Sequence, residues 1–177
     1  MAIQAIKDQL GDFAKDTKLN LSSVLTEEGA PDLKKNQIFG IALASAYATK
    51  DRQLVAEILS EAKEVLSEAE INAAKAAATI MGMNNVYYRF QHLVSDKDYT
   101  TMPARLRMNV IGNPGVKKLD FELYSLAVSA INGCGRCIDA HADSIVKEGL
   151  SKTGVQSTVR IASVINAAAQ GLFINSL

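Results

Sequence analysis

The sequence contains no tryptophan, only three prolines and two cysteines, and no excess of charge of either sign. Nineteen basic and nineteen acidic residues give a formal net charge of zero. The chain therefore has no surplus of positive charge to attract phosphate backbones or anionic lipid headgroups, and we expect neither nucleic acid nor a membrane as a partner. The same balance does little to keep monomers apart, which leaves self-association open.

Long apolar segments are missing as well. The N-terminal stretch Met1–Asp8 reaches charged side chains before an apolar run of signal-peptide length develops, and no run of about 18 apolar residues follows. We therefore expect a soluble, cytoplasmic protein. Hydrophobic residues still make up 48% of the chain, which is enough to bury a core, so we do not expect disorder.

Strand signals are nearly absent. The sequence shows no sustained alternation of apolar and polar residues, and no Asn-Gly or Asp-Gly pair joins two such runs. Apolar residues instead recur at steps of three and four, beginning with Ile3, Ile6, Leu10 and Phe13. This pattern predicts an all-α protein, and no linker divides its single domain over residues 1–177.

Capping and turn signals predict where the helices begin and end. Ser67 and Glu70 have the spacing of a capping box, Asp120 is a good N-cap, and Gly149 suits a helix end. A polar stretch containing Pro31 predicts a loop at about 20–35. The helices expected from these signals and from apolar spacing cover about 3–13, 36–49, 51–65, a stretch from 67, 103–113 before an Asn-Pro-Gly turn, 120–132, 134–148, and a last helix from about 155.

A faint internal similarity appears when the sequence is shifted by fifty positions. The shift aligns two alanine-rich helices of like character, around residues 77–81 and 127–131. It places Asn84, Tyr87 and Gln91 opposite Cys134, Cys137 and His141. We interpret this as a weak internal repeat of a helical unit, in which only the later copy, about residues 116–177, carries cysteines.

The two cysteines lie three positions apart, in Cys134-Gly135-Arg136-Cys137. In a chain without a secretory signal an idle disulfide would be kept reduced, so the pair is more readily explained by chemistry than by structure. At a helix start this spacing places the thiols one turn apart and points the positive end of the helix dipole at a thiolate. His141 shares the same helical face, which puts a titratable base beside the thiols.

Positive charge at the motif and burial of the thiols would shift the pKa of the cysteines in opposite directions. Arg136 and a protonated His141 would lower the pKa of a neighbouring thiol, whereas apolar surroundings would raise it. We expect the effect of the charges and the helix dipole to outweigh that of burial, so that the thiol pKa is lowered. His92 has no second base or ligand near it in the sequence, and we assign it no role.

A Cys-x-x-Cys motif can also serve structural, metal-binding or haem-attaching roles. The cysteines could be small buried hydrophobic residues, with His141 on the surface. A closed zinc site needs four ligands, and the whole chain contains two cysteines and two histidines. Haem attachment requires a histidine directly after the second cysteine, where Ile138 stands. The sequence therefore favours redox chemistry and excludes a c-type haem at this motif.

Distinctive short segments occur along nearly the whole chain. They are Leu19-Asn20-Leu21-Ser22-Ser23, Met81-Gly82-Met83-Asn84-Asn85-Val86-Tyr87-Tyr88, Arg107-Met108-Asn109, Asn113-Pro114-Gly115, Phe121-Glu122-Leu123 and Ser129-Ala130-Ile131-Asn132-Gly133-Cys134. Together with the spacing Glu-x11-Cys-x-x-Cys-x-x-x-His, they resemble the AhpD family of alkyl hydroperoxide reductases, within the carboxymuconolactone decarboxylase-like superfamily. The resemblance implies an AhpD-like helical fold that assembles as a homotrimer and reduces peroxides through thiols in an antioxidant system.

The resemblance also implies partners. The family's electron donor is dihydrolipoamide on a 2-oxoacid dehydrogenase component, and its acceptor is the peroxiredoxin AhpC. On this basis the chain would pass reducing equivalents from a lipoyl arm to the peroxiredoxin disulfide. No bound flavin, haem or metal is implied.

Matched by position, the resemblance assigns roles to four residues. Cys137 corresponds to the attacking thiol that becomes a sulfenic acid, and Cys134 to the proton donor that then closes the disulfide. Glu122 and His141 correspond to a proton relay, although Glu122 alone, in a first helical turn, would be interpreted as a capping residue. Arg136 departs from the best-known members, which have a histidine there, so the resemblance carries no proton-transfer role over to this position, although a positive charge remains.

Two functions of other classes stay open at this point. The chain could be a non-enzymatic helical assembly whose cysteines sense oxidation by changing contacts. It could also carry out lactone decarboxylase-type chemistry on a small molecule, which would not need both thiols. The physiological peroxide and the true electron donor are not fixed by the sequence.

Overall fold

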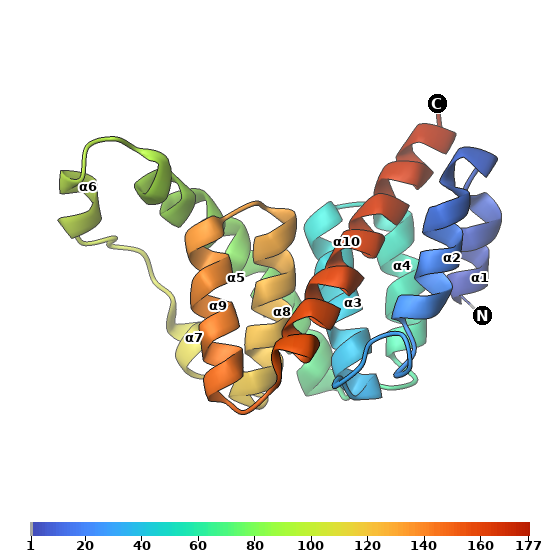
Figure 1. Cartoon of the computed structure of the whole chain (residues 1–177), viewed down its shortest axis with the longest axis horizontal. Coiled ribbons are helices and arrows are strands. Elements are labelled where there is room, and N and C mark those ends of the chain that lie inside the picture. Colours follow the sequence, from blue (N-terminus) through green and yellow to red (C-terminus); the bar gives the residue numbers. More distant parts are fainter. Residues whose placement is uncertain (1) are drawn as a thin grey trace.

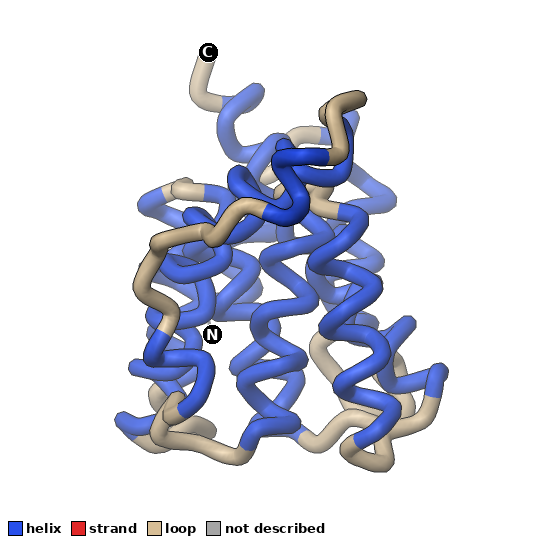
Figure 2. Tube along the Cα trace, turned by 90° about the vertical axis from the view of Figure 1, so that its left-hand side faces the viewer, coloured by secondary structure: helices blue, strands red, loops and turns tan. Residues whose placement is uncertain are grey.

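The structure is a computed structural model that describes the backbone of residues 2–177 and the side chains from Ile3 onward. Met1, the first residue of the N-terminal stretch Met1–Asp8, lies outside the described residues. The described chain consists of helices and loops only, which confirms the all-α prediction (Figure 2). In chain order the elements are α1 (Ala2–Gln9), the short 3-10 helix η1 (Asp12–Ala14), α2 (Lys15–Val24), α3 (Lys35–Thr49), α4 (Arg52–Ala62), α5 (Glu68–Leu93), α6 (Asp98–Thr101), α7 (Asn109–Gly112), α8 (Lys118–Ile131), α9 (Gly135–Lys147) and α10 (Lys152–Asn175).

Helices α3 and α8 form the centre of the molecule. Residues 37–46 of α3 and 120–129 of α8 are all buried, because most of their side chains are apolar or small and Gln37 and Asp120 pair with each other. They pack against each other, and α5 and α10 cover them, with α10 running across both (Figure 1). Helix α9 packs on α8 and α5, and α1, α2 and α4 lie at the opposite end of the molecule.

Helix α5 begins at the capping box that the sequence predicts. The Ser67 hydroxyl accepts a hydrogen bond from the Glu70 amide, and the Glu70 carboxylate accepts one from the Ser67 amide at 2.8 Å. Asn36 donates a further bond to Glu70 at 2.7 Å, which ties α5 to the start of α3. Partial burial opposes ionisation of Glu70, but the hydrogen bonds from Asn36 and Ser67 outweigh it and hold its pKa below the ordinary value.

The N-terminal prediction is wrong in its details. The expected single helix through Phe13 ends at Gln9, and α2 then occupies part of the expected loop, up to Val24. Gly11 is extended at the break. This lets Leu10 turn into the core against Gly171 of α10, while Phe13 remains 62% exposed. Tertiary packing therefore overrides the apolar spacing here.

Two further boundaries differ from the sequence prediction. Helix α8 begins two residues before Asp120, whose buried carboxylate accepts a hydrogen bond from Gln37 at 2.8 Å and so joins α8 to α3 instead of acting as an N-cap. The helix expected over 103–113 is only the four-residue α7, and Pro103 lies in a non-helical segment. That segment belongs to an arm that carries the unpredicted α6 away from the bundle (Figure 1).

Of the remaining predictions, α4 ends at Ala62 instead of about 65 and α10 begins at Lys152 instead of about 155, while the two glycine turns are where they were expected. Gly115 has a positive φ in the Asn-Pro-Gly turn before α8, and Gly149 has one after α9. Ser151 caps α10 through a hydrogen bond from the Gly154 amide. No helix of residues 2–177 is long and apolar enough to cross a membrane.

Candidate functional site

The turn between α8 and α9 places the first cysteine. Gly133 has a φ of 67°, its amide bonds to the Ala130 carbonyl, and the Cys134 amide bonds to the Ser129 carbonyl. This pair of bonds is a Schellman motif, which needs a residue in the left-handed conformation directly after the helix. Glycine adopts that conformation without strain. It reverses the chain so that Cys134 becomes the N-cap residue of α9.

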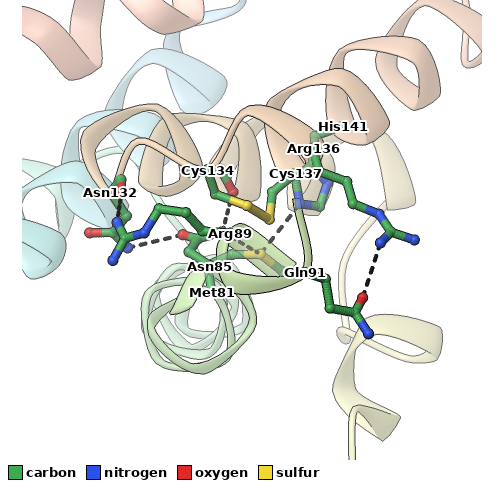
Figure 3. Close-up of a disulfide and its surroundings, with 10 residues drawn as sticks. Met81, Asn85, Arg89, Gln91, Asn132, Cys134, Arg136, Cys137 and His141 are labelled. Atoms are coloured by element: carbon green, nitrogen blue, oxygen red, sulfur yellow. Dashed lines mark hydrogen bonds between the residues drawn. A yellow bond between two sulfur atoms is a disulfide. The ribbon is translucent and has the colours of Figure 1, made fainter. Parts of the chain in front are cut away.

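The two cysteines form a disulfide across the first turn of α9. Their Cα atoms are 5.3 Å apart, a spacing that a disulfide can bridge without moving the backbone. Cys134 is completely buried, whereas Cys137 is 6% exposed. Solvent therefore reaches the disulfide, which Figure 3 shows with its surroundings, from the Cys137 side according to these exposures.

Glu122 and His141 meet beside this disulfide. The Nδ1 atom of His141 lies 2.7 Å from a carboxylate oxygen of Glu122, and both side chains are largely buried between α8 and α9. The other ring nitrogen, Nε2, lies 3.3 Å from the sulfur of Met81 on α5. Both neighbours are hydrogen-bond acceptors, so each contact is satisfied when the nitrogen that faces it carries a hydrogen. An imidazole paired with a carboxylate in this way is able to hold a proton and release it.

Helix α5 forms the floor of the site through a chain of amide hydrogen bonds. Asn85 donates to the Ser129 hydroxyl at 2.9 Å and accepts from the Asn132 side chain at 2.9 Å. Arg89 donates to the Asn132 carbonyl. These bonds fix the turn immediately before Cys134 (Figure 3). Asn85 belongs to one of the distinctive sequence segments, but no local signal in the sequence predicts a role for Asn85 or Arg89.

A cavity of about 310 Å³ opens at the disulfide. It is lined by Met81, Asn84 and Tyr88 of α5, Met108 and Ile111 of the following arm and α7, and Arg136, Cys137, Ala140 and His141 of α9. Cys137 contributes to its wall and Cys134 does not. A molecule in the cavity would therefore meet the Cys137 sulfur and the His141 imidazole together.

The structure thus brings together all four site residues predicted from the sequence, Glu122, Cys134, Cys137 and His141. His92 is exposed near the end of α5, outside the residues that line the cavity. Within residues 2–177, no three side chains of His, Cys, Asp or Glu are grouped so that they could hold a metal ion. The arrangement can exchange thiols and disulfides and move a proton.

Comparison with known proteins shows the family to which the chain is similar. A family model described as the carboxymuconolactone decarboxylase family matches residues 97–172, which include the four residues above. The chain is 58% identical over 168 residues to alkyl hydroperoxide reductase AhpD of Coxiella burnetii (strain RSA 493 / Nine Mile phase I), covering 95% of each protein. It is 54% identical over 172 residues to AhpD of Hyphomonas neptunium, covering 97% of this chain and 94% of that one. It is 54% identical over 176 residues to AhpD of Maricaulis maris, covering 99% of this chain and 100% of that one.

Proposed function

The chain belongs to the AhpD alkyl hydroperoxide reductases of the carboxymuconolactone decarboxylase family, and from this premise we propose that it reduces hydroperoxides through a Cys134/Cys137 redox centre. Membership carries a role related to alkyl hydroperoxide reduction. The observation that supports the finer proposal is the position of Cys137, at the wall of a cavity that it shares with His141. Cys134 lies buried behind it, within disulfide distance.

The proposed cycle begins with the dithiol form. The relay of His141 and Glu122 takes the proton of Cys137, and the thiolate attacks an oxygen of the hydroperoxide. A sulfur–oxygen bond forms as the oxygen–oxygen bond breaks, and the alkoxide takes the proton of Cys134 to leave as an alcohol. Cys137 is then a sulfenic acid.

The second half of the cycle closes and reopens the disulfide. The Cys134 thiolate attacks the oxidised sulfur, and the departing hydroxide takes the proton held by the relay to form water. A dithiol donor then reduces the disulfide by two successive exchanges and becomes a disulfide itself. One hydroperoxide and two donor thiols thus give one alcohol, one water and one donor disulfide.

We propose dihydrolipoamide, on a 2-oxoacid dehydrogenase component, as this donor, and the peroxiredoxin AhpC as a partner that the chain regenerates. An unbranched acyl chain ending in a dithiol suits the cavity, because its walls are mainly the apolar side chains of Met81, Tyr88, Met108 and Ile111. With such a donor the protein would work in the cytoplasm as part of an antioxidant system.

We also propose that the chain assembles as a homotrimer. Several large apolar side chains stay exposed on the second half of α5 and on the arm that follows it, and a subunit interface would cover them. They are Val86, Phe90, Leu93, Tyr99, Met102 and Leu106.

A reconstituted assay tests the proposal. Purified protein, dihydrolipoamide and tert-butyl hydroperoxide are combined with and without an AhpC-type peroxiredoxin, and consumption of the dithiol is followed. We expect turnover that requires both this protein and dihydrolipoamide, and that rises when the peroxiredoxin is present. If dihydrolipoamide is not consumed under either condition, the proposed function is wrong.

A further inference from the structure

Arg136 occupies an unusual position for a charged residue. It lies between the two cysteines, and its side chain extends away from the disulfide along the wall of the cavity (Figure 3). One guanidinium nitrogen donates to the Gln91 side-chain oxygen at 3.0 Å, and the guanidinium lies 5.3 Å from the centre of the Tyr88 ring. Among residues 2–177, no carboxylate lies within ion-pair distance of it. The cation is therefore held by neutral partners alone.

The partner that holds Arg136 is itself fixed. Gln91 is only 4% exposed, and its side-chain nitrogen donates to the Tyr99 carbonyl at 2.9 Å and to the Tyr87 hydroxyl at 3.2 Å. These two bonds leave its oxygen aimed at Arg136. The ring of Tyr88 adds a cation–π contact from a second direction. Arg136 is an exposed residue, but these two contacts hold its guanidinium at the wall of the cavity.

The rest of the cavity is mainly apolar. The side chains of Tyr88, Met108 and Ile111 line it together with Arg136, and the reactive sulfur of Cys137 belongs to its wall. Asn84 also lines it and is 4% exposed, and its side-chain oxygen has no hydrogen-bond donor. Buried polar atoms are rarely left without a partner, so a hydroxyl-type donor on a molecule in the cavity would supply the one that Asn84 lacks.

From these contacts we propose that the cavity prefers hydroperoxides that carry an apolar chain and a carboxylate, with Arg136 binding the carboxylate. This inference rests on the proposed function, since it names the substrate class of the same site. A guanidinium has five N–H donors in a planar fork, and the bond to Gln91 uses one side of it. The remaining donors match the two oxygens of a carboxylate, while the apolar wall accepts the chain.

Two substrates that differ only in whether the carboxylate is free or methyl-esterified test the inference. The specificity constant kcat/KM is measured for linoleic acid hydroperoxide and for its methyl ester, with dihydrolipoamide as the donor. We expect the protein to prefer the acid by about tenfold, the scale of one charge-assisted hydrogen-bonded pair. In Arg136→Gln the ratio should fall to about one, and in Arg136→Lys it should lie between, because the charge remains but the fork is lost.

The ratio removes any general effect of the substitution on Cys137, because both substrates react with the same thiol. Lys147→Gln is the matched control, since Lys147 is an exposed cation near the other end of α9, and its ratio should equal that of the unchanged protein. Equal rates for acid and ester in the unchanged protein, or a ratio that survives Arg136→Gln, overturn the inference while the proposed function stands. If neither these substrates nor tert-butyl hydroperoxide is reduced, the proposed function fails first.

Discussion

Replacing Cys137 with serine should reduce dihydrolipoamide-dependent hydroperoxide turnover by at least about a thousandfold, because a hydroxyl is neither an adequate nucleophile here nor able to form a disulfide. Serine is close in size to cysteine, and Cys137 sits at the cavity wall with 6% of its surface exposed, so the fold should persist. The measurement is the steady-state rate of dihydrolipoamide consumption. Thermal unfolding of the same sample shows whether the variant is folded.

Cys134→Ser is the matched variant, because it changes the other half of the same disulfide. It should also lose sustained turnover, but its Cys137 can still be oxidised once, so a sulfenic acid should accumulate and be trapped by dimedone. Cys137→Ser should give no such adduct. Full turnover in Cys137→Ser would refute the assigned roles, and activity that survives loss of both cysteines would favour the lactone-type chemistry of the superfamily.

Glu122→Gln should lower kcat/KM for hydroperoxides by about a hundredfold, the scale of losing a positioned proton-transfer group. An amide keeps the size of the side chain and one hydrogen bond to His141, but it cannot hold the proton that the relay must store and return. The measurement is the pH profile of kcat/KM. It should lose the ionisation that depends on the pair, which a purely structural effect would leave in place.

Asp120→Asn is the control for Glu122→Gln. Asp120 is also a buried carboxylate in the first turns of α8, but its partner is Gln37 of α3 and not His141. We expect this variant to lose stability and keep its pH profile. If the two variants change the profile equally, or if Glu122→Gln retains full activity, the relay is assigned wrongly.

Local signals in the sequence predicted those parts of the fold that local interactions determine. The capping box at Ser67, the helix end at Gly149 and the turn at Asn113-Pro114-Gly115 depend on residues within a few positions of each other. The break after Gln9 could not be predicted in this way, because it depends on Leu10 packing against a glycine of α10 far along the chain. The role of Asp120 could not be predicted for the same reason, since its partner Gln37 comes from another helix.

In the site, too, local spacing could be predicted from the sequence and contacts between distant helices could not. The spacing of Cys134, Cys137 and His141 placed them on one helical face from sequence alone. The contact between Glu122 and His141 joins two helices and was expected only from the family resemblance, since its position alone indicated capping. The contribution of α5, above all Gln91 beneath Arg136, had no local signal, because these residues lie more than forty positions from the cysteines. The catalytic roles themselves remain predictions.

The whole proposal depends on Cys134 and Cys137 alternating between dithiol and disulfide during turnover. Protein reduced with dihydrolipoamide and freed of excess donor is mixed with one equivalent of hydroperoxide, quenched with iodoacetamide in denaturant, and analysed by mass spectrometry at several times. Before the oxidant is added, both cysteines should carry the alkyl group. Afterwards both should be unalkylated and joined in a disulfide, at a rate that matches hydroperoxide loss, and fresh dihydrolipoamide should restore the alkylation. Hydroperoxide that disappears while both cysteines stay fully alkylated would contradict it.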